Sequence, residues 1–78
     1  MLKFRLIEKN ADIVVYRYWH ETCTEYGEVT VKIEDGELVS MNLAPEDEFK
    51  WYAFHLLSRI RKFAKDKKFD EYGMIAWY

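Results

Sequence analysis

The sequence is short of the residues that would mark a secreted, membrane-spanning or phosphate-binding protein. Cys23 is the only cysteine, so no intrachain disulfide is possible, whereas small secreted domains usually carry several. No stretch approaches the ~20 apolar residues of a membrane span, and a strand pattern starts at once, without an apolar signal region. Only three glycines occur, and they do not form a glycine-rich phosphate loop. We therefore expect a cytoplasmic protein with no membrane partner.

An excess of charge of one sign is also missing. The formal net charge of the 78 residues is −2, so the chain has no global electrostatic attraction for nucleic acid or anionic membranes. Half of the residues are hydrophobic and 18% are aromatic, a composition that argues against disorder. The length allows one domain, spanning 1–78, with no room for a second.

The first strand is predicted at residues 2–8, where apolar and polar residues alternate. Leu2, Phe4 and Leu6 fall on one face and Ile7 on the other, the period-2 pattern of a half-buried strand. Polar and small residues follow at positions 10–12, and they predict the turn into a second strand.

The second strand, residues 13–19, is rich in β-branched and aromatic residues, but its parity is ambiguous. Tyr16 and Tyr18 compete with Trp19 for the inside of the domain. Arg17 decides between the two parities, because an unpaired guanidinium in a thin core costs several kcal/mol. We therefore predict that Arg17 and Trp19 face outward and the two tyrosines face inward.

The turn at residues 34–37 sets the register between the third and fourth strands. A two-residue Asp-Gly turn would waste the core face, whereas a three-residue loop with Gly36 in the left-handed conformation keeps the apolar side chains together. We choose the second register. It pairs Val31 with Val39 and Val29 with Met41.

An amphipathic helix is predicted from Pro45 to Asp66. Proline suits the first helical position, and acidic residues near the start and basic residues near the end complement the helix dipole. One apolar stripe, spanning roughly 140°, is the face that a two-layer domain buries. Its members are Phe49, Tyr52, Ala53, Leu56, Leu57, Ile60, Phe63 and Ala64. A last strand at residues 74–78 completes an α+β domain, in which an antiparallel sheet packs on one helix in the order β-β-β-β-α-β.

The helix carries more apolar surface than this core requires. Trp51 and Phe54 lie outside the stripe, and exposed aromatic clusters on small proteins tend to mark contacts. The sequence predicts them as anchors of a partner surface, whose polar rim is Arg61, Lys62 and Lys65. A second apolar patch is expected on the outer face of the sheet, made of Ile7, Val15, Trp19 and Leu38. We therefore expect a non-catalytic protein that works by association, as a homodimer or with another protein.

No arrangement of residues predicts a catalytic site, a metal or a cofactor. His20 and Cys23 supply two good ligands in one loop with Glu21 and Glu25, whereas structural zinc normally takes four. The same glutamates would oppose a reactive Cys23 thiolate, and His55 is far along the chain on the helix. Two thin layers also offer little of the concavity that general acid–base catalysis needs.

Nucleic-acid binding is the alternative function. Six of the twelve basic residues lie in the segment Arg59–Lys68, which could contact phosphates while the nearby Trp51 and Phe54 stack on bases. The acidic net charge and the lack of an RNP-type motif favour a solvated helix end instead.

Four short stretches carry a resemblance that covers nearly the whole chain. They are Tyr16-Arg17-Tyr18, the strand opened by Gly27, the helix motif Asp47-x-Phe49-x-x-Tyr52-Ala53, and Ala76-Trp77-Tyr78. In these stretches the chain resembles a group of short bacterial proteins of unknown function that begin with strands and end in a Trp-Tyr pair. The resemblance implies the same fold but no activity, and Cys23 is not part of it.

Overall fold

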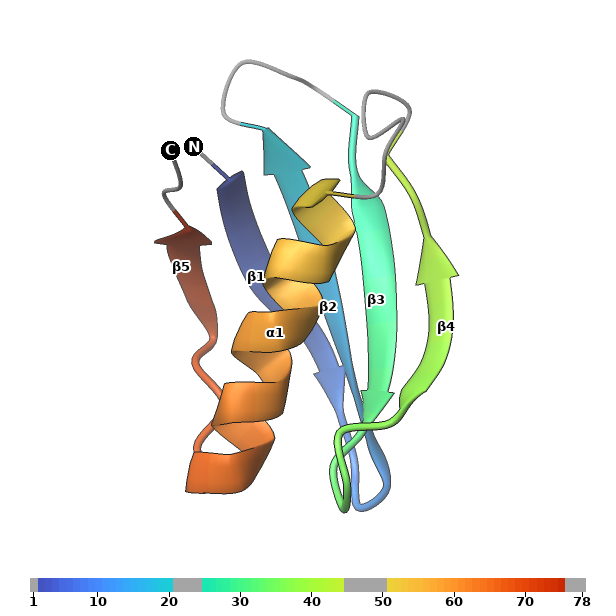
Figure 1. Cartoon of the computed structure of the whole chain (residues 1–78), viewed down its shortest axis with the longest axis vertical. Helices are drawn as coiled ribbons and strands as arrows, with labels where there is room; N and C mark the ends of the chain where they lie inside the picture. The colour runs from blue at the N-terminus through green and yellow to red at the C-terminus, as the bar shows by residue number, and fades with distance from the viewer. Residues whose placement is uncertain (1, 21–24, 45–50, 76–78) are drawn as a thin grey trace.

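One antiparallel sheet and one helix make up the described part of the protein, which in this computed structural model is residues 2–20, 25–44 and 51–75. The elements are β1 (Leu2–Lys9), β2 (Ile13–His20), β3 (Gly27–Lys32), β4 (Leu38–Asn42), α1 (Trp51–Asp66) and β5 (Tyr72–Ile75). The strands lie in the order β4-β3-β2-β1-β5, and α1 crosses one face of the sheet (Figure 1). The predicted α+β class and its two layers are confirmed.

The core lies between α1 and the inner face of the sheet. Arg17 lies outside this core, bonded to Glu28, and Tyr16 and Tyr18 are fully buried, so the predicted parity of β2 is confirmed. The rings of Phe4, Tyr16 and Phe63 meet at centroid distances of 5.7 to 6.0 Å. The buried apolar residues are Leu2, Phe4, Val14, Tyr16, Tyr18, Val29, Val31, Ala44, Ala53, Leu56, Leu57, Ile60, Phe63 and Ile75.

The helix ends just before the position at which a lysine would enter the apolar stripe. Lys67 takes a left-handed conformation with φ of 56°. Its N–H donates to the Ala64 carbonyl at 3.3 Å, and the N–H of Lys68 donates to the Phe63 carbonyl at 3.1 Å. These two bonds form a Schellman motif, which satisfies carbonyls that the helix end would otherwise leave unpaired. The predicted end at Asp66 is therefore confirmed.

The predicted register of β4 is half right. Val29 pairs with Met41 as expected, and Gly36 has the predicted left-handed φ of 74°. Val31 pairs with Leu38 and not with Val39, because Val39 is an extra residue in a β-bulge. A bulge shifts the alternation of side chains by one position. Leu38 consequently packs against the core, so its predicted place in the outer patch is wrong.

A second bulge lies in β1, where Leu6 pairs with Tyr16 and Glu8 pairs with Val15. Ile7 is the extra residue there, and 43% of its surface is exposed, in line with its predicted outward position.

Some predictions concern residues outside the described ranges. They are the helix start at Pro45, the acidic residues 46–48, Phe49 in the stripe, the loop residues Glu21 and Cys23, and residues 76–78 of the last strand.

Candidate functional site

The face of the sheet turned away from α1, which we call the outer face, carries aromatic and cationic side chains in adjacent rows. Lys3 of β1 lies between Trp19 of β2 and Met74 of β5. Two residues further along, Arg5 lies beside Tyr72. These pairings follow from the antiparallel register, in which directly opposite residues point to the same side of the sheet.

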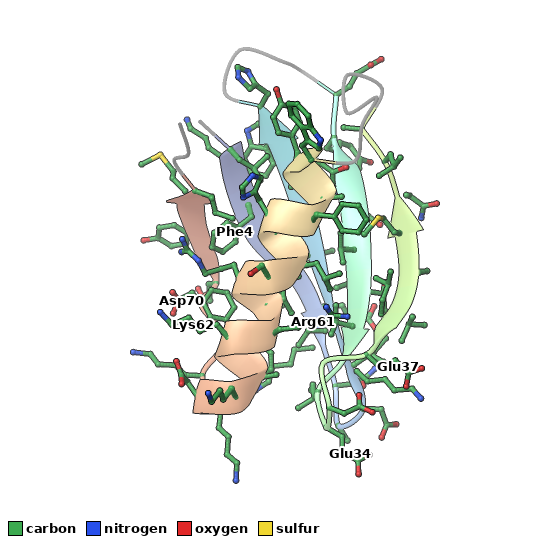
Figure 2. The ribbon with its side chains drawn as sticks, viewed as in Figure 1. Phe4, Glu34, Glu37, Arg61, Lys62 and Asp70 are labelled. Carbon is green, nitrogen blue, oxygen red and sulfur yellow. The ribbon has the colours of Figure 1, made fainter. Side chains whose placement is uncertain are left out.

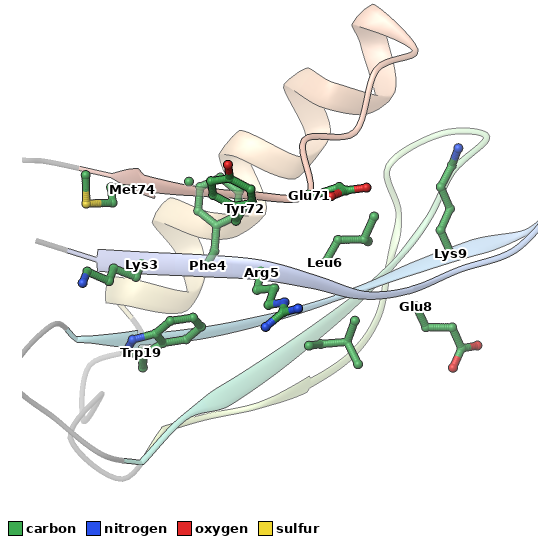
Figure 3. A pocket seen from close by; sticks show the side chains of 12 residues that line it. Lys3, Phe4, Arg5, Leu6, Glu8, Lys9, Trp19, Glu71, Tyr72 and Met74 are labelled. Atoms are coloured by element: carbon green, nitrogen blue, oxygen red, sulfur yellow. The ribbon is translucent and has the colours of Figure 1, made fainter.

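An open hollow of about 900 Å³ runs along β1 and β5 on this side of the molecule (Figure 3). Tyr72 and Met74 are 76% and 55% exposed beside it. The hollow was not expected from two thin layers. It lies where the four-residue β5 runs beside the eight-residue β1. Its lining comprises Lys3, Phe4, Arg5, Leu6, Ile7, Glu8, Lys9, Trp19, Glu71, Tyr72, Gly73 and Met74.

The cations of the outer face differ in their partners. Arg17 donates to Glu28 at 2.8 and 3.0 Å and lies over the Tyr26 ring, 4.0 Å from its centroid. Within the described residues, Lys3 and Arg5 make no ion pair and no side-chain hydrogen bond. A hydrated charge beside an exposed ring can pair with an incoming group at small desolvation cost. The hollow therefore combines apolar contact area with two available cations.

The predicted helix surface is not one compact patch. Trp51 and Phe54 are 64% and 51% exposed, as expected. The Arg61 guanidinium, however, donates to the Gly36 carbonyl at 3.0 Å, which ties the helix to the β3–β4 turn. Figure 2 shows Arg61 on the side of β3 and β4 and Lys62 on the side of β5. Lys65 lies a further turn along, about 21 Å from Trp51 at 1.5 Å per residue, so the basic residues do not surround the two aromatic rings.

The second predicted patch is partly assembled. Ile7 and Trp19 line the same hollow, whereas Val15 lies farther along the outer face, between Glu8 and Thr30.

The basic end of the helix is interrupted by acidic residues. Its surface hollow, about 450 Å³, is lined by Arg59, Lys62, Phe63, Asp66, Lys68 and Asp70. Two carboxylates among the cations lower the positive potential that would attract a phosphate backbone.

The two histidines lie on different elements, β2 and α1. The His20 ring packs near Tyr52, with ring centroids 5.8 Å apart, and His55 is exposed on α1. In the ranges described, no group of three or more His, Cys, Asp or Glu residues is placed to hold a metal ion.

Tyr16 holds its hydroxyl group inside the domain. The hydroxyl donates to the Asp70 carbonyl at 2.7 Å, which fastens β2 to the segment entering β5. Burial raises the pKa of the Tyr16 hydroxyl above its usual value, and the Asp70 carboxylate raises that pKa further. The shift keeps a structural hydrogen-bond donor protonated, and the group does not open into the hollow on the outer face.

This shift predicts that alkali destabilises the fold. Above pH ~10 the unfolded chain releases the Tyr16 proton while the folded chain keeps it, so stability falls as pH rises, by up to about 1.4 kcal/mol per pH unit. Tyr16→Phe should flatten this slope, measured by urea unfolding between pH 9 and 11.5. The exposed-site variant Tyr72→Phe should retain the slope of the parent; an unchanged slope in Tyr16→Phe would contradict the assignment.

The described helix is too short and too polar to cross a membrane. Comparison with models of protein families, with curated proteins and with solved structures finds no match to this chain. The α+β architecture therefore defines the class of the domain, and its function has to be argued from its own surfaces.

Sequence reasoning missed the contribution of β5 to the outer face. The predicted last strand began at residue 74, whereas β5 starts two residues earlier, at Tyr72. The available signal was the alternation at residues 72–75, where the exposed Tyr72 and Met74 flank Gly73 and precede the buried Ile75.

Proposed function

We propose that this chain is a small non-catalytic cytoplasmic protein that acts by binding another protein chain, with a second copy of itself as the first candidate. The surface we assign is the hollow on the outer face along β1 and β5. The observation that carries the proposal is the coincidence of exposed Tyr72, Met74 and Ile7 with two cations, Lys3 and Arg5, in one hollow.

The composition of this surface supports a protein partner. Protein interfaces are enriched in aromatic residues, methionine and arginine, and binding energy concentrates in rings that a partner can desolvate. Trp19 lies at the same hollow as Tyr72 and Met74. Clusters of this kind are rarely left open to water on a small soluble domain.

The test is molar mass in solution over a concentration series, by sedimentation or light scattering. The monomer has a mass of 9.5 kDa, and we expect the average mass to rise toward twice that value. Ile7→Ala combined with Tyr72→Ala should weaken association at least tenfold, because it removes two anchors.

Trp51→Ala combined with Phe54→Ala is the matched control, because it also removes two exposed apolar side chains. We expect this helix variant to stay folded and to associate within about twofold of the parent. Loss of association in the helix variant alone would move the site to α1. A monomer at every concentration would remove self-association from the proposal.

Single-stranded nucleic acid is the second candidate partner, favoured by the placement of Lys3 and Arg5 beside Trp19 and Tyr72. Cations next to aromatic rings suit phosphates and stacked bases. Such binding should fall steeply with salt. A lack of retention on mixed single- and double-stranded nucleic acid at low salt would reject it.

A further inference from the structure

We propose that two copies of this chain pair edge to edge along β5, so that the sheet continues across a two-fold axis. The inference rests on the proposed function, association through the β1–β5 surface, and names both the occupant and the geometry of contact.

The backbone of β5 has an open hydrogen-bonding side. The N–H of Leu6 donates to the Glu71 carbonyl at 2.7 Å, so the polar groups of Glu71 point toward β1. Backbone direction alternates along a strand, so the N–H and C=O groups of Tyr72 and Met74 point away from β1. In the described part of the chain, β1 is the only strand beside β5. Two donors and two acceptors therefore face the open edge.

These groups are self-complementary about Gly73. A two-fold axis through Gly73, perpendicular to the sheet, sets Tyr72 opposite Met74 of the second copy and Met74 opposite Tyr72 of that copy. Both pairs exchange two backbone bonds, as hydrogen-bonded antiparallel pairs do. Both side chains lie on the outer face, and a thioether beside an aromatic ring is a favourable contact. The pairing thus covers the two most exposed apolar side chains of the hollow.

The two edges of the sheet are not equivalent. The β4 edge is interrupted by the bulge at Val39, and bulges are a common device against edge-to-edge pairing. β5 pairs with β1 without a shift in register, and its four residues include no charge and no proline. Only the β5 edge therefore offers a regular template for another strand.

The short edge sets the expected strength. Four backbone bonds and two side-chain pairs form an interface below the roughly 1,200 Å² of stable complexes, so the dimer should be transient. We expect it to dissociate on dilution over roughly 10 µM to 1 mM.

The deciding measurement combines molar mass with amide hydrogen exchange by NMR at low and high concentration of the full chain. If edge pairing occurs, the amides of Tyr72 and Met74 become protected as the average mass rises. Protection that stays unchanged while the mass doubles would overturn edge pairing and leave association intact. A mass of 9.5 kDa at 1 mM would overturn edge pairing and remove self-association from the proposed function, which would then require a different protein chain as partner.

Charge variants test the proposed β5–β5 contact at exposed positions, where substitution should leave the fold intact. Tyr72→Glu combined with Met74→Glu places carboxylates beside Arg5 and Lys3 within one chain but opposite each other across the two-fold axis. We expect a folded monomer, with association weakened at least tenfold. Val39→Glu is the matched control on the other edge, since Val39 is 51% exposed. A parent-like mass for the double variant, or an equal loss for Val39→Glu, would overturn the assignment to β5.

A second variant acts on the backbone alone. Met74→Pro removes an N–H that points to the open edge and leaves the bonds to β1 in place, a position that edge strands tolerate for proline. It should also yield a monomer with parent-like unfolding. A folded Met74→Pro dimer would contradict the pairing.

Discussion

Phe4→Ala should lower the free energy of unfolding by about 3–5 kcal/mol, as truncation of a buried phenylalanine commonly does. Phe4 is 1% exposed, and its ring meets those of Tyr16 at 5.7 Å and Phe63 at 6.0 Å. Alanine would remove the ring from the centre of this cluster and leave a cavity that the surrounding strands fill only in part.

The effect of Phe4→Ala should be read from urea or thermal unfolding followed by circular dichroism. At about 4–8 °C per kcal/mol for a domain of this size, the expected fall in Tm is roughly 12–40 °C. Phe54→Ala provides the matched control, because that ring is 51% exposed and its loss should change stability by less than about 0.5 kcal/mol. Phe4→Leu, which keeps most of the volume, should cost less than half as much as Phe4→Ala. Equal effects of the two alanine variants would contradict the placement of the core.

Phe4 also connects the core to the proposed function. A methyl group built on Gly73 would lie 2.6 Å from the Phe4 ring, so the glycine lets β5 pass directly over that ring. Four cross-strand pairs and this contact hold β5 in the sheet. Phe4→Ala should therefore loosen β5 and weaken association together, whereas the glutamate variant of β5 should weaken association alone. Comparing the two variants therefore distinguishes loss of association through a destabilised fold from loss through a changed contact surface.

The parity of β2 could be predicted because one residue made the alternative costly. Arg17 on the inner face would have been an unpaired buried charge, and the structure instead gives it Glu28 and the Tyr26 ring outside the core. The end of α1 could be predicted for a similar reason, since Lys67 would have entered the apolar stripe. In both cases the alternative would have buried a charged side chain in an apolar environment, and the residue concerned can be read directly from the sequence.

The bulges and the order of the strands could not be predicted in this way. On either side of an extra residue a strand keeps its ordinary alternation of apolar and polar residues. The sequence around Val39 and Ile7 therefore did not indicate a shift in the pairing register. The position of β5 next to β1 depends on long-range pairing between the two ends of the chain. The hollow and the open edge depend on that pairing. The sequence therefore placed Ile7 and Trp19 on the outer face but missed the exposed Tyr72 and Met74 that β5 adds beside them.

Gly27→Ala should lower the free energy of unfolding by about 3 kcal/mol or more, nearly as much as Phe4→Ala. A methyl group at this position would lie 2.6 Å from the Ala44 nitrogen, the Asn42 oxygen and a ring carbon of Tyr18. Two of these atoms belong to the backbone, so they cannot move aside by a change of rotamer. The Ala44 N–H is also bonded to the Tyr18 hydroxyl at 3.0 Å, and displacing it would break a buried hydrogen bond.

Gly36→Ala is the comparison that tests this reasoning. Its φ of 74° makes alanine strained, at about 1–2 kcal/mol, but the nearest atom is the flexible Arg61 Cγ at 3.1 Å. Gly36→Ala should therefore cost less than Gly27→Ala in the same unfolding experiment. In a double-mutant cycle, Tyr18→Phe and Gly27→Ala together should cost less than the sum of their separate losses, because both changes remove the hydrogen bond to Ala44. A larger loss of stability for Gly36→Ala than for Gly27→Ala would contradict this reasoning. Conformational strain would then outweigh backbone proximity, and the close approach of β3 to the chain at Asn42 and Ala44 would be wrong.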